Sequence, residues 1–131
     1  MIQQRKKDYL QRLIEEFFAK LHELANENKN SDSNSTEKKR IVSECFFLFN
    51  NDFDISQEDS SETIVIKIGD NDLIEQYAKL LQTKYEISDI KEIYQLHTAL
   101  DLIEYLEATD TTYSWNRTIL KEDILRLLDA S

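Results

Sequence analysis

Hydrophobic and polar positions alternate at helical spacing over the first 27 residues of the chain. The apolar positions recur at intervals of three and four residues, which is the period of one face of an α-helix. They are Leu10, Leu13, Ile14, Phe17, Phe18, Leu21, Leu24 and Ala25. Polar residues occupy the opposite face, where Arg12 and Glu16 stand one turn apart. The pattern predicts an amphipathic helix over residues 4–27, with too few heptads for a coiled coil.

A polar stretch, NENKNSDSNST, follows over residues 26–36 and offers nothing to a hydrophobic core. Its composition predicts a mobile surface linker over residues 28–35. Asn34, three residues before Glu37, then supplies a capping pattern for the next helix. We expect that helix over residues 36–50, with a buried face of Ile41, Val42, Cys45, Phe46, Leu48 and Phe49.

The segment 58–68 carries two conflicting signals. Its β-branched run Thr63–Ile68 is typical of a strand. No second run in the chain resembles a partner strand, and an unpaired strand leaves backbone groups without hydrogen bonds. We therefore predict a short helix that is capped by Ser60 or Ser61 and ends at Gly69.

Three further helices are expected in the C-terminal part, over residues 72–86, 89–108 and 112–129. Asp72 stands three residues before Glu75 in a capping pattern, and Ser88 is placed to cap the second of these helices. The very short link between the first two predicts an antiparallel hairpin on which the last helix packs. The predicted fold class is all-α, a bundle of about five helices with a C-terminal helical hairpin. Residues 1–131 then form a single domain, made of the helix 1–27, the linker 28–35 and the bundle 36–131.

Composition agrees with a helical protein in a reducing compartment. Pro is absent, and Gly69 is the one glycine. Cys45 is the one cysteine, so no internal disulfide forms and a cytoplasmic location is expected. Its apolar neighbours in the run 45–49 predict a buried, unreactive thiol.

The net charge of −10 predicts that the protein avoids nucleic acid and anionic membranes. The basic runs 5–7 and 38–40 are interpreted as solvated helix termini. The sequence also lacks an apolar stretch long enough to cross a membrane.

The candidate metal sites fail on spacing. Asn50–Asp54 resembles the start of a calcium-binding loop, but Ile55 and Ser61 stand where a Gly and a bidentate Glu are needed. The two histidines, His22 and His97, are too few and too far apart for a zinc site. Acidic pairs on the predicted helices are attributed to solvated surfaces. We therefore expect no metal, no cofactor and no enzymatic activity.

The apolar stripe of the first helix is the most informative candidate for function. Because apolar side chains are stabilised by burial, this stripe packs on its own domain, on a second copy or on a partner. The candidate interaction residues are Phe17, Phe18 and Leu21. A homodimer through these residues and their full burial in the monomer both remain open.

Two segments, Asp8–Phe17 and Thr98–Arg117, resemble a small bacterial family of helical, tetratricopeptide-like proteins of unknown function. The first contains a Tyr followed by an Arg-Leu-Ile helix. The second contains a Leu-rich helix that ends at an aromatic-Ser-aromatic turn. The resemblance implies that the C-terminal hairpin is all-helical and tetratricopeptide-like, and it implies no particular activity. The tetratricopeptide pattern itself is absent from the middle of the chain.

The sequence therefore predicts a cytoplasmic helical interaction or scaffold protein that acts through helix-mediated binding. Its partner is another protein or a second copy of the chain. The alternative is a regulatory subunit or an enzyme with an acidic cleft, in which carboxylates with shifted pKa values gather in a pocket.

Overall fold

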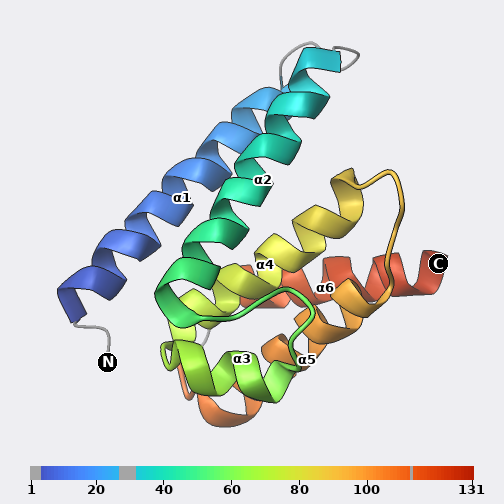
Figure 1. The fold of residues 1–131 in the computed structure, drawn as a ribbon. Coiled ribbons are helices and arrows are strands. Elements are labelled where there is room, and N and C mark those ends of the chain that lie inside the picture. The colour runs from blue at the N-terminus through green and yellow to red at the C-terminus, as the bar shows by residue number, and fades with distance from the viewer. Residues whose placement is uncertain (1–3, 27–31, 113) are drawn as a thin grey trace.

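The computed structural model describes residues 4–26, 32–112 and 114–131, which fold into α-helices with no strand among them (Figure 1). The helices are α1 (Gln4–Asn26), α2 (Asp32–Phe53), α3 (Ser61–Ile68), α4 (Asn71–Ile87), α5 (Tyr94–Thr109) and α6 (Trp115–Ala130). The predicted all-α bundle is confirmed. No described helix has the length and apolar character needed to cross a membrane.

Helix α4 lies at the centre of the bundle. It packs against every other helix, and its most extensive contact is with α5. Helices α1 and α2 run side by side across one part of α4, and α6 lies beyond α5 (Figure 1). The core gathers around Leu73, Tyr77 and Leu81 of α4, each at most 1% exposed. The hairpin of α4 and α5 is thus present, and its likeness to a tetratricopeptide repeat stays a prediction.

The short helix α3 forms as predicted. Ser60 is its N-cap, with Oγ accepting the N–H of Thr63 at 3.2 Å. Gly69 ends the helix in the left-handed region at φ 62°. Ile64 is buried whereas Ile66 is 79% exposed. Burial along the β-branched run therefore follows the helical repeat. Packing on α4 and α5 therefore overrides β-propensity here.

The predicted linker was too long, because α2 begins at Asp32. Residues 32–35 are helical, and residues 27–31 lie outside the described part of the chain. Asn34 is inside the helix instead of capping it, and its Nδ2 donates to the carbonyl oxygen of Leu24 at 3.3 Å. This contact with the end of α1 favours helix in a segment whose residues individually prefer turns.

The far end of α2 also extends beyond the prediction, from residue 50 to Phe53. Phe53 is only 7% exposed, so its burial favours one more turn of helix. Asp54 then ends the helix with φ 56°, and its N–H donates to the carbonyl oxygen of Asn50 at 2.8 Å.

The cap of α4 is Asp70, not Asp72. The N–H of Leu73 donates to Oδ1 of Asp70 at 3.0 Å. Two acidic residues thus stand near this helix start, and the sequence pattern selected the wrong one. The choice follows from Gly69, whose left-handed conformation ends α3 and leaves Asp70 extended at the cap position.

Ser88 does not begin the following helix, which starts at Tyr94 instead of residue 89. Ser88 ends α4, and its N–H donates to the carbonyl oxygen of Lys84 at 3.1 Å. The link 88–93 is held by Lys91, whose ammonium donates to the carbonyl oxygens of Tyr85, Glu86 and Ser88 at 2.9–3.1 Å. The last carbonyls of a helix have no backbone N–H partner within the helix. Lys91 supplies hydrogen bonds to the carbonyl oxygens at this end of α4.

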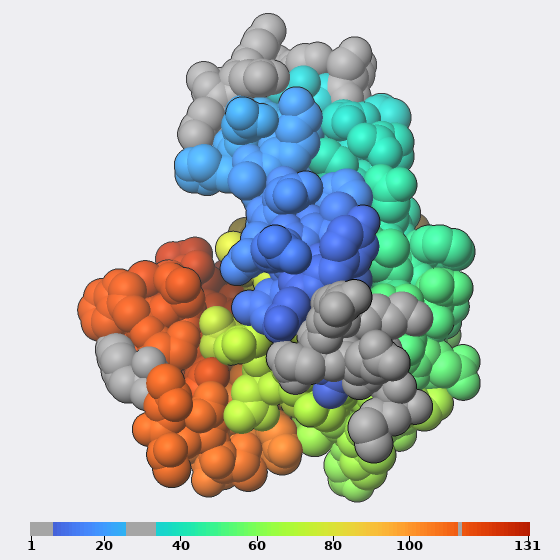
Figure 2. Space-filling view, turned by 90° about the vertical axis from the view of Figure 1, so that its left-hand side faces the viewer, coloured from blue at the N-terminus to red at the C-terminus, as the bar shows by residue number. Residues whose placement is uncertain are grey.

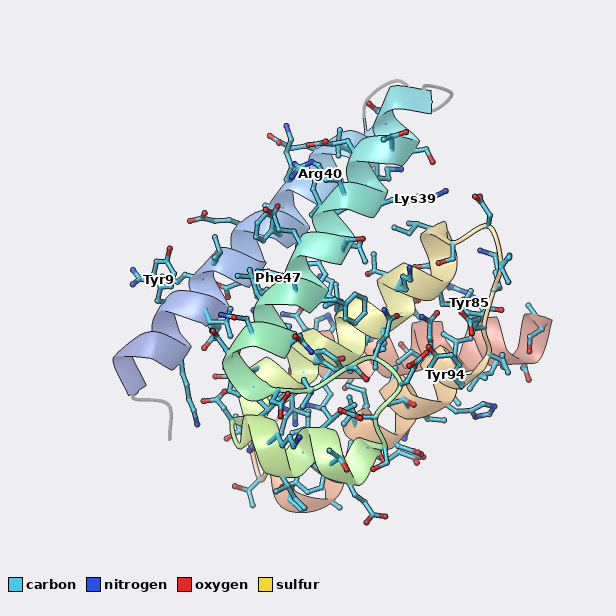
Figure 3. The ribbon with its side chains drawn as sticks, in the orientation of Figure 1. Tyr9, Lys39, Arg40, Phe47, Tyr85 and Tyr94 are labelled. Atoms are coloured by element: carbon cyan, nitrogen blue, oxygen red, sulfur yellow. The ribbon has the colours of Figure 1, made fainter. Side chains whose placement is uncertain are left out.

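The basic run 38–40 is partly or fully exposed, but it lies inside α2 and not at its terminus, because the helix already begins at Asp32. Lys39 extends toward the link 88–93, where its Nζ is 2.9 Å from Oδ2 of Asp89 (Figure 3). Arg40 pairs with Glu37 and Glu44 of its own helix. In the run 5–7, the Nζ of Lys7 donates to the carbonyl oxygen of Gly69 at 3.4 Å.

Helix α6 begins at Trp115, three residues later than predicted. Ser114 is its N-cap, with Oγ accepting the N–H of Arg117 at 3.1 Å. Tyr113, which is within the range predicted for this helix, lies outside the described residues.

Candidate binding cleft between α1, α4 and α6

A cleft of about 960 Å³ opens between α1, α4, α6 and the loop that precedes α6. Figure 2 shows this hollow, with α1 on one side and α6 on the other. Its apolar side chains are Phe18 from α1 and Ile119 and Leu120 from α6. Its charged side chains are Glu15, Asp72, Glu75, Lys79, Asp110, Arg117 and Asp123.

Helix α4 presents one polar face to this cleft. Asp72, Glu75, Lys79 and Gln82 follow one another at spacings of three and four residues, so they share one side of the helix. The other sides of α4 are buried in the core. Helices α1 and α6 both pack on α4, and they border the polar face from either side.

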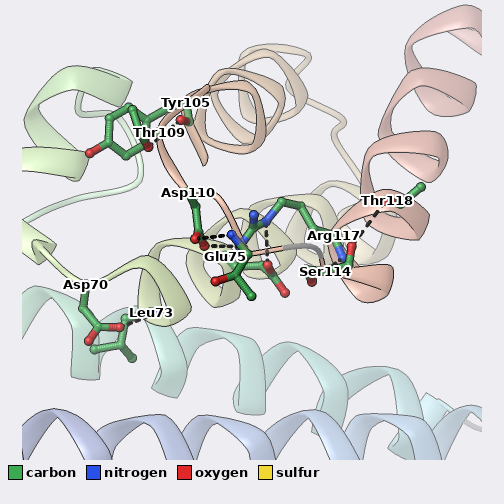
Figure 4. Close-up of polar contacts among 10 residues, drawn as sticks. Asp70, Leu73, Glu75, Tyr105, Thr109, Asp110, Ser114, Arg117 and Thr118 are labelled. Atoms are coloured by element: carbon green, nitrogen blue, oxygen red, sulfur yellow. Dashed lines mark hydrogen bonds and ion pairs between the residues drawn. The ribbon is translucent and has the colours of Figure 1, made fainter. Parts of the chain in front are cut away.

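Arg117 is the central charged group of the cleft and is only 6% exposed (Figure 4). Its Nε donates to Oε1 of Glu75 at 2.8 Å, and its Nη2 donates to Oδ2 of Asp110 at 3.1 Å. The backbone N–H of Thr112 also donates to Oδ1 of Asp110, at 3.0 Å. The cluster therefore connects α4, the loop before α6 and the first turn of α6.

The pKa values of Asp110 and Arg117 are shifted in the directions that keep both groups charged at neutral pH. Hydrogen bonds from the Thr112 backbone and from Arg117 lower the pKa of Asp110. Burial alone would lower the pKa of Arg117, but its hydrogen bonds with Asp110 and Glu75 outweigh burial and raise it. A general acid or base works best with a pKa near the operating pH. These two groups are instead held charged, which suits orientation and binding.

Phe18 and Lys79 form a contact across the cleft. The Nζ of Lys79 lies 4.6 Å from the ring centroid of Phe18, a cation–π geometry. Both residues also line a second hollow of about 700 Å³, together with Glu16, Ala19, Lys20, His22 and Glu23. The cleft therefore continues past this contact along α1.

The three interaction residues predicted from sequence are placed differently. Leu21 is 9% exposed and belongs to the core. Phe17 and Phe18 are partly buried and pack against that core. Of the three, Phe18 lines the cleft. The structure thus divides the apolar stripe of α1 between the monomer's own core and the cleft wall.

Sequence reasoning missed the charged cluster of Glu75, Asp110 and Arg117. One signal was available, because Arg117 stands three residues before Leu120 and seven before Ile124, on the apolar face of its helix. A charged group on a buried face requires ionic partners. Which carboxylates provide them depends on the tertiary fold.

The cysteine and the two histidines are not part of the cleft. Cys45 is fully buried, and burial, with a smaller effect of Glu44, raises the pKa of its thiol to about 12. The predicted unreactive core cysteine is thus supported. His22 and His97 are exposed. Within the described ranges, no group of His, Cys, Asp or Glu is arranged to hold a metal ion.

The protein is thus an all-α bundle with a cleft on one face, and carboxylates outnumber cations in the lining of this cleft. Comparisons with protein-family models, with curated proteins and with solved structures each find no match to this chain.

Proposed function

We propose that this protein is a helical interaction protein that binds a segment of a partner protein in the cleft between α1, α4 and α6. One observation carries the proposal: the cleft combines apolar walls with a small set of oriented charged groups. Binding sites in proteins are typically concave, with apolar lining and a few placed polar groups.

The composition of the cleft border supports a protein partner. Ile119 lines the cleft and is 41% exposed, and Trp115, one turn before it on α6, is 64% exposed. Exposed aromatic and aliphatic side chains of this kind are typical of protein interfaces. Between α1 and α6, a segment of a partner would pack on a helix at either side. This is the helix-in-groove mode of peptide recognition.

A scaffold role in the cytoplasm and a tetratricopeptide-like hairpin are parts of the same proposal. The buried, reduced Cys45 is compatible with a reducing compartment. The antiparallel packing of α4 and α5 provides the kind of hairpin from which helical binding surfaces are built.

The test begins with a library of displayed helical peptides, from which those that bind the immobilised protein are selected. The affinity of the selected peptides is then measured for the unmodified protein and for two variants. Ile119→Glu places a charge in the cleft wall. Leu125→Glu places the same charge on the same helix, at a side chain that is 44% exposed and does not line the cleft. We expect selected peptides to bind the Leu125→Glu protein normally and to lose about tenfold or more in affinity for the Ile119→Glu protein.

Circular dichroism of both variants verifies that they remain folded. An equal loss of affinity in the two variants, or a selection that yields no binding peptide, contradicts the proposed function.

A further inference from the structure

We infer that the occupant of the cleft is a cationic amphipathic helix, with Lys or Arg side chains flanking an apolar stripe. This inference rests on the proposed function and specifies the chemistry of the partner.

The charge of the cleft indicates a cationic partner. Its lining contains five carboxylates and two cations. Both cations are already engaged, since Arg117 pairs with Glu75 and Asp110 and Lys79 lies over Phe18. The cleft therefore keeps an excess of negative charge that its own cations do not neutralise. Complementary charge on a partner accelerates association and excludes partners of the wrong sign.

Two of these carboxylates are placed to receive new cations. Glu15 on α1 and Asp72 on α4 are exposed, and the described part of the chain supplies neither of them with an ion pair. They belong to two different helices that border the same hollow. A Lys or Arg on each flank of an inserted helix can therefore meet a carboxylate.

The apolar positions indicate where the stripe of the partner lies. Phe18 stands on the α1 wall and Ile119 on the α6 wall, so apolar surface faces the hollow from both sides. Ile119 is 41% exposed, which leaves apolar area for a partner to cover. A purely charged ligand such as a polyamine would leave this area in water, whereas an amphipathic helix covers it.

The extent of the hollow favours a helix over a small molecule. The cleft of about 960 Å³ and the hollow of about 700 Å³ share Phe18 and Lys79 in their linings, so the recessed surface extends along α1 beyond the cleft. The cleft alone reaches the upper end of the roughly 300–1,000 Å³ that small-molecule sites occupy. A helix, which lengthens by about 1.5 Å per residue, is a partner that can cover both hollows.

The experiment uses three synthetic helical peptides that share one apolar stripe and differ in their flanks, which carry Lys and Arg, Gln, or Glu. Fluorescence anisotropy measures their affinity for the full chain. We expect the cationic peptide to bind about tenfold or more tightly than the Gln peptide, and the acidic peptide more weakly than both. Added salt should reduce the advantage of the cationic peptide.

A charge variant of the cleft tests the location. The double variant Glu15→Gln with Asp72→Asn should lower the affinity for the cationic peptide toward that of the Gln peptide, and should leave the Gln peptide unchanged. The matched control is Asp101→Asn with Glu104→Gln. These two acids are exposed on α5 and do not line the cleft. The control should bind the cationic peptide as the unmodified protein does.

The outcomes separate the two proposals. Equal affinity for the cationic and Gln peptides overturns the cationic partner and leaves the cleft as a binding site. Equal losses in the cleft variant and the control overturn the assignment to this cleft, because only overall charge then matters. A second copy of the chain in the cleft, seen as a dimer by light scattering, overturns the assignment of a separate partner. Binding of none of the three peptides overturns the inference, and a failed peptide selection overturns the function as well.

Discussion

At the scale of single residues, Arg117 connects three parts of the chain beside the cleft. Its side chain is 8% exposed, and its two carboxylate partners come from α4 and from the loop before α6. Removal of one member of such a cluster leaves a charge without its partner in a partly buried place, which is more costly than loss of a surface ion pair. The cluster therefore holds the loop before α6 against α4, at the edge of the cleft.

The lowered pKa of Asp110 predicts a pH dependence of stability. A carboxyl whose folded pKa lies below its ordinary value of 3.8 binds fewer protons in the folded state. Its stabilising contribution is therefore present above pH 3.8 and is lost as the pH falls below 3.8 through the lowered value. We expect the free energy of unfolding to fall less steeply with acidification in Asp110→Asn than in the unmodified protein.

Urea denaturation at a series of pH values measures this dependence. Asp101→Asn, which removes an exposed carboxylate of α5 outside the cluster, is the control and should keep the slope of the unmodified protein. Parallel curves for Asp110→Asn and the unmodified protein would show that the cluster has no part in acid stability.

At the scale of secondary structure elements, the helix ends depend on a few residues with special conformations. Gly69 ends α3 and Asp54 ends α2, both in the left-handed region, where a side chain costs conformational energy. Asp70 starts α4 directly after Gly69, so the direction of the chain between α3 and α4 is set within two residues. Lys91 completes the other end of α4.

Gly69→Ala should destabilise the protein by about 1 kcal/mol. An added Cβ would meet no atom closer than the carbonyl oxygen of Ile66 at 3.9 Å, so the expected cost comes from the φ of 62° and not from a clash. Urea denaturation measures the difference in the free energy of unfolding.

Asp54→Gly is the companion variant. We expect it to raise the free energy of unfolding, whereas Gly69→Ala should lower it. It relieves the same backbone conformation, at φ 56°. Lys67 loses only an exposed contact of 3.7 Å to the carboxylate and keeps its hydrogen bond to the carbonyl oxygen of Asp54. Unchanged stability in Gly69→Ala would contradict the importance of this conformation.

At the scale of the whole molecule, the central position of α4 determines which surfaces remain for partners. Because α4 packs on every other helix, most of its surface is used inside the bundle. Its polar face toward the cleft remains accessible between α1 and α6. On α1, Leu21 lies in the core and Phe18 faces the cleft, so one apolar stripe serves both stability and the candidate site.

Phe18→Glu distinguishes the two roles proposed for the stripe of α1. Phe18 packs against the core and lies under Lys79. We therefore expect the variant to melt at a lower temperature and to keep the molecular mass in solution of the unmodified protein. Light scattering over a range of concentrations, together with thermal unfolding, measures both quantities. If the unmodified protein instead forms a dimer and Phe18→Glu yields a folded monomer, the homodimer through Phe17, Phe18 and Leu21 is supported.

The sequence by itself determined which segments are helical and which thiol is buried. The apolar spacing along α1, the lack of Pro and the single Gly69 are local properties, and helix formation depends on such properties within a few residues. Even α3, with its β-branched run, was predicted correctly, because no second run in the chain could pair with it as a strand, and Ser60 and Gly69 were available to bound a helix. The burial of Cys45 followed from its apolar neighbours.

Only the tertiary structure decided where helices begin and how the cleft is built. The early start of α2 involves Asn34 and Leu24, which meet because α1 and α2 lie side by side. The ion pair of Arg117 with Glu75 joins residues that are 42 positions apart in the chain. Local pattern shows that a buried arginine needs a carboxylate, but which of the 26 acidic residues is near depends on how the helices pack. The site depends on these long-range distances, which local spacing does not determine.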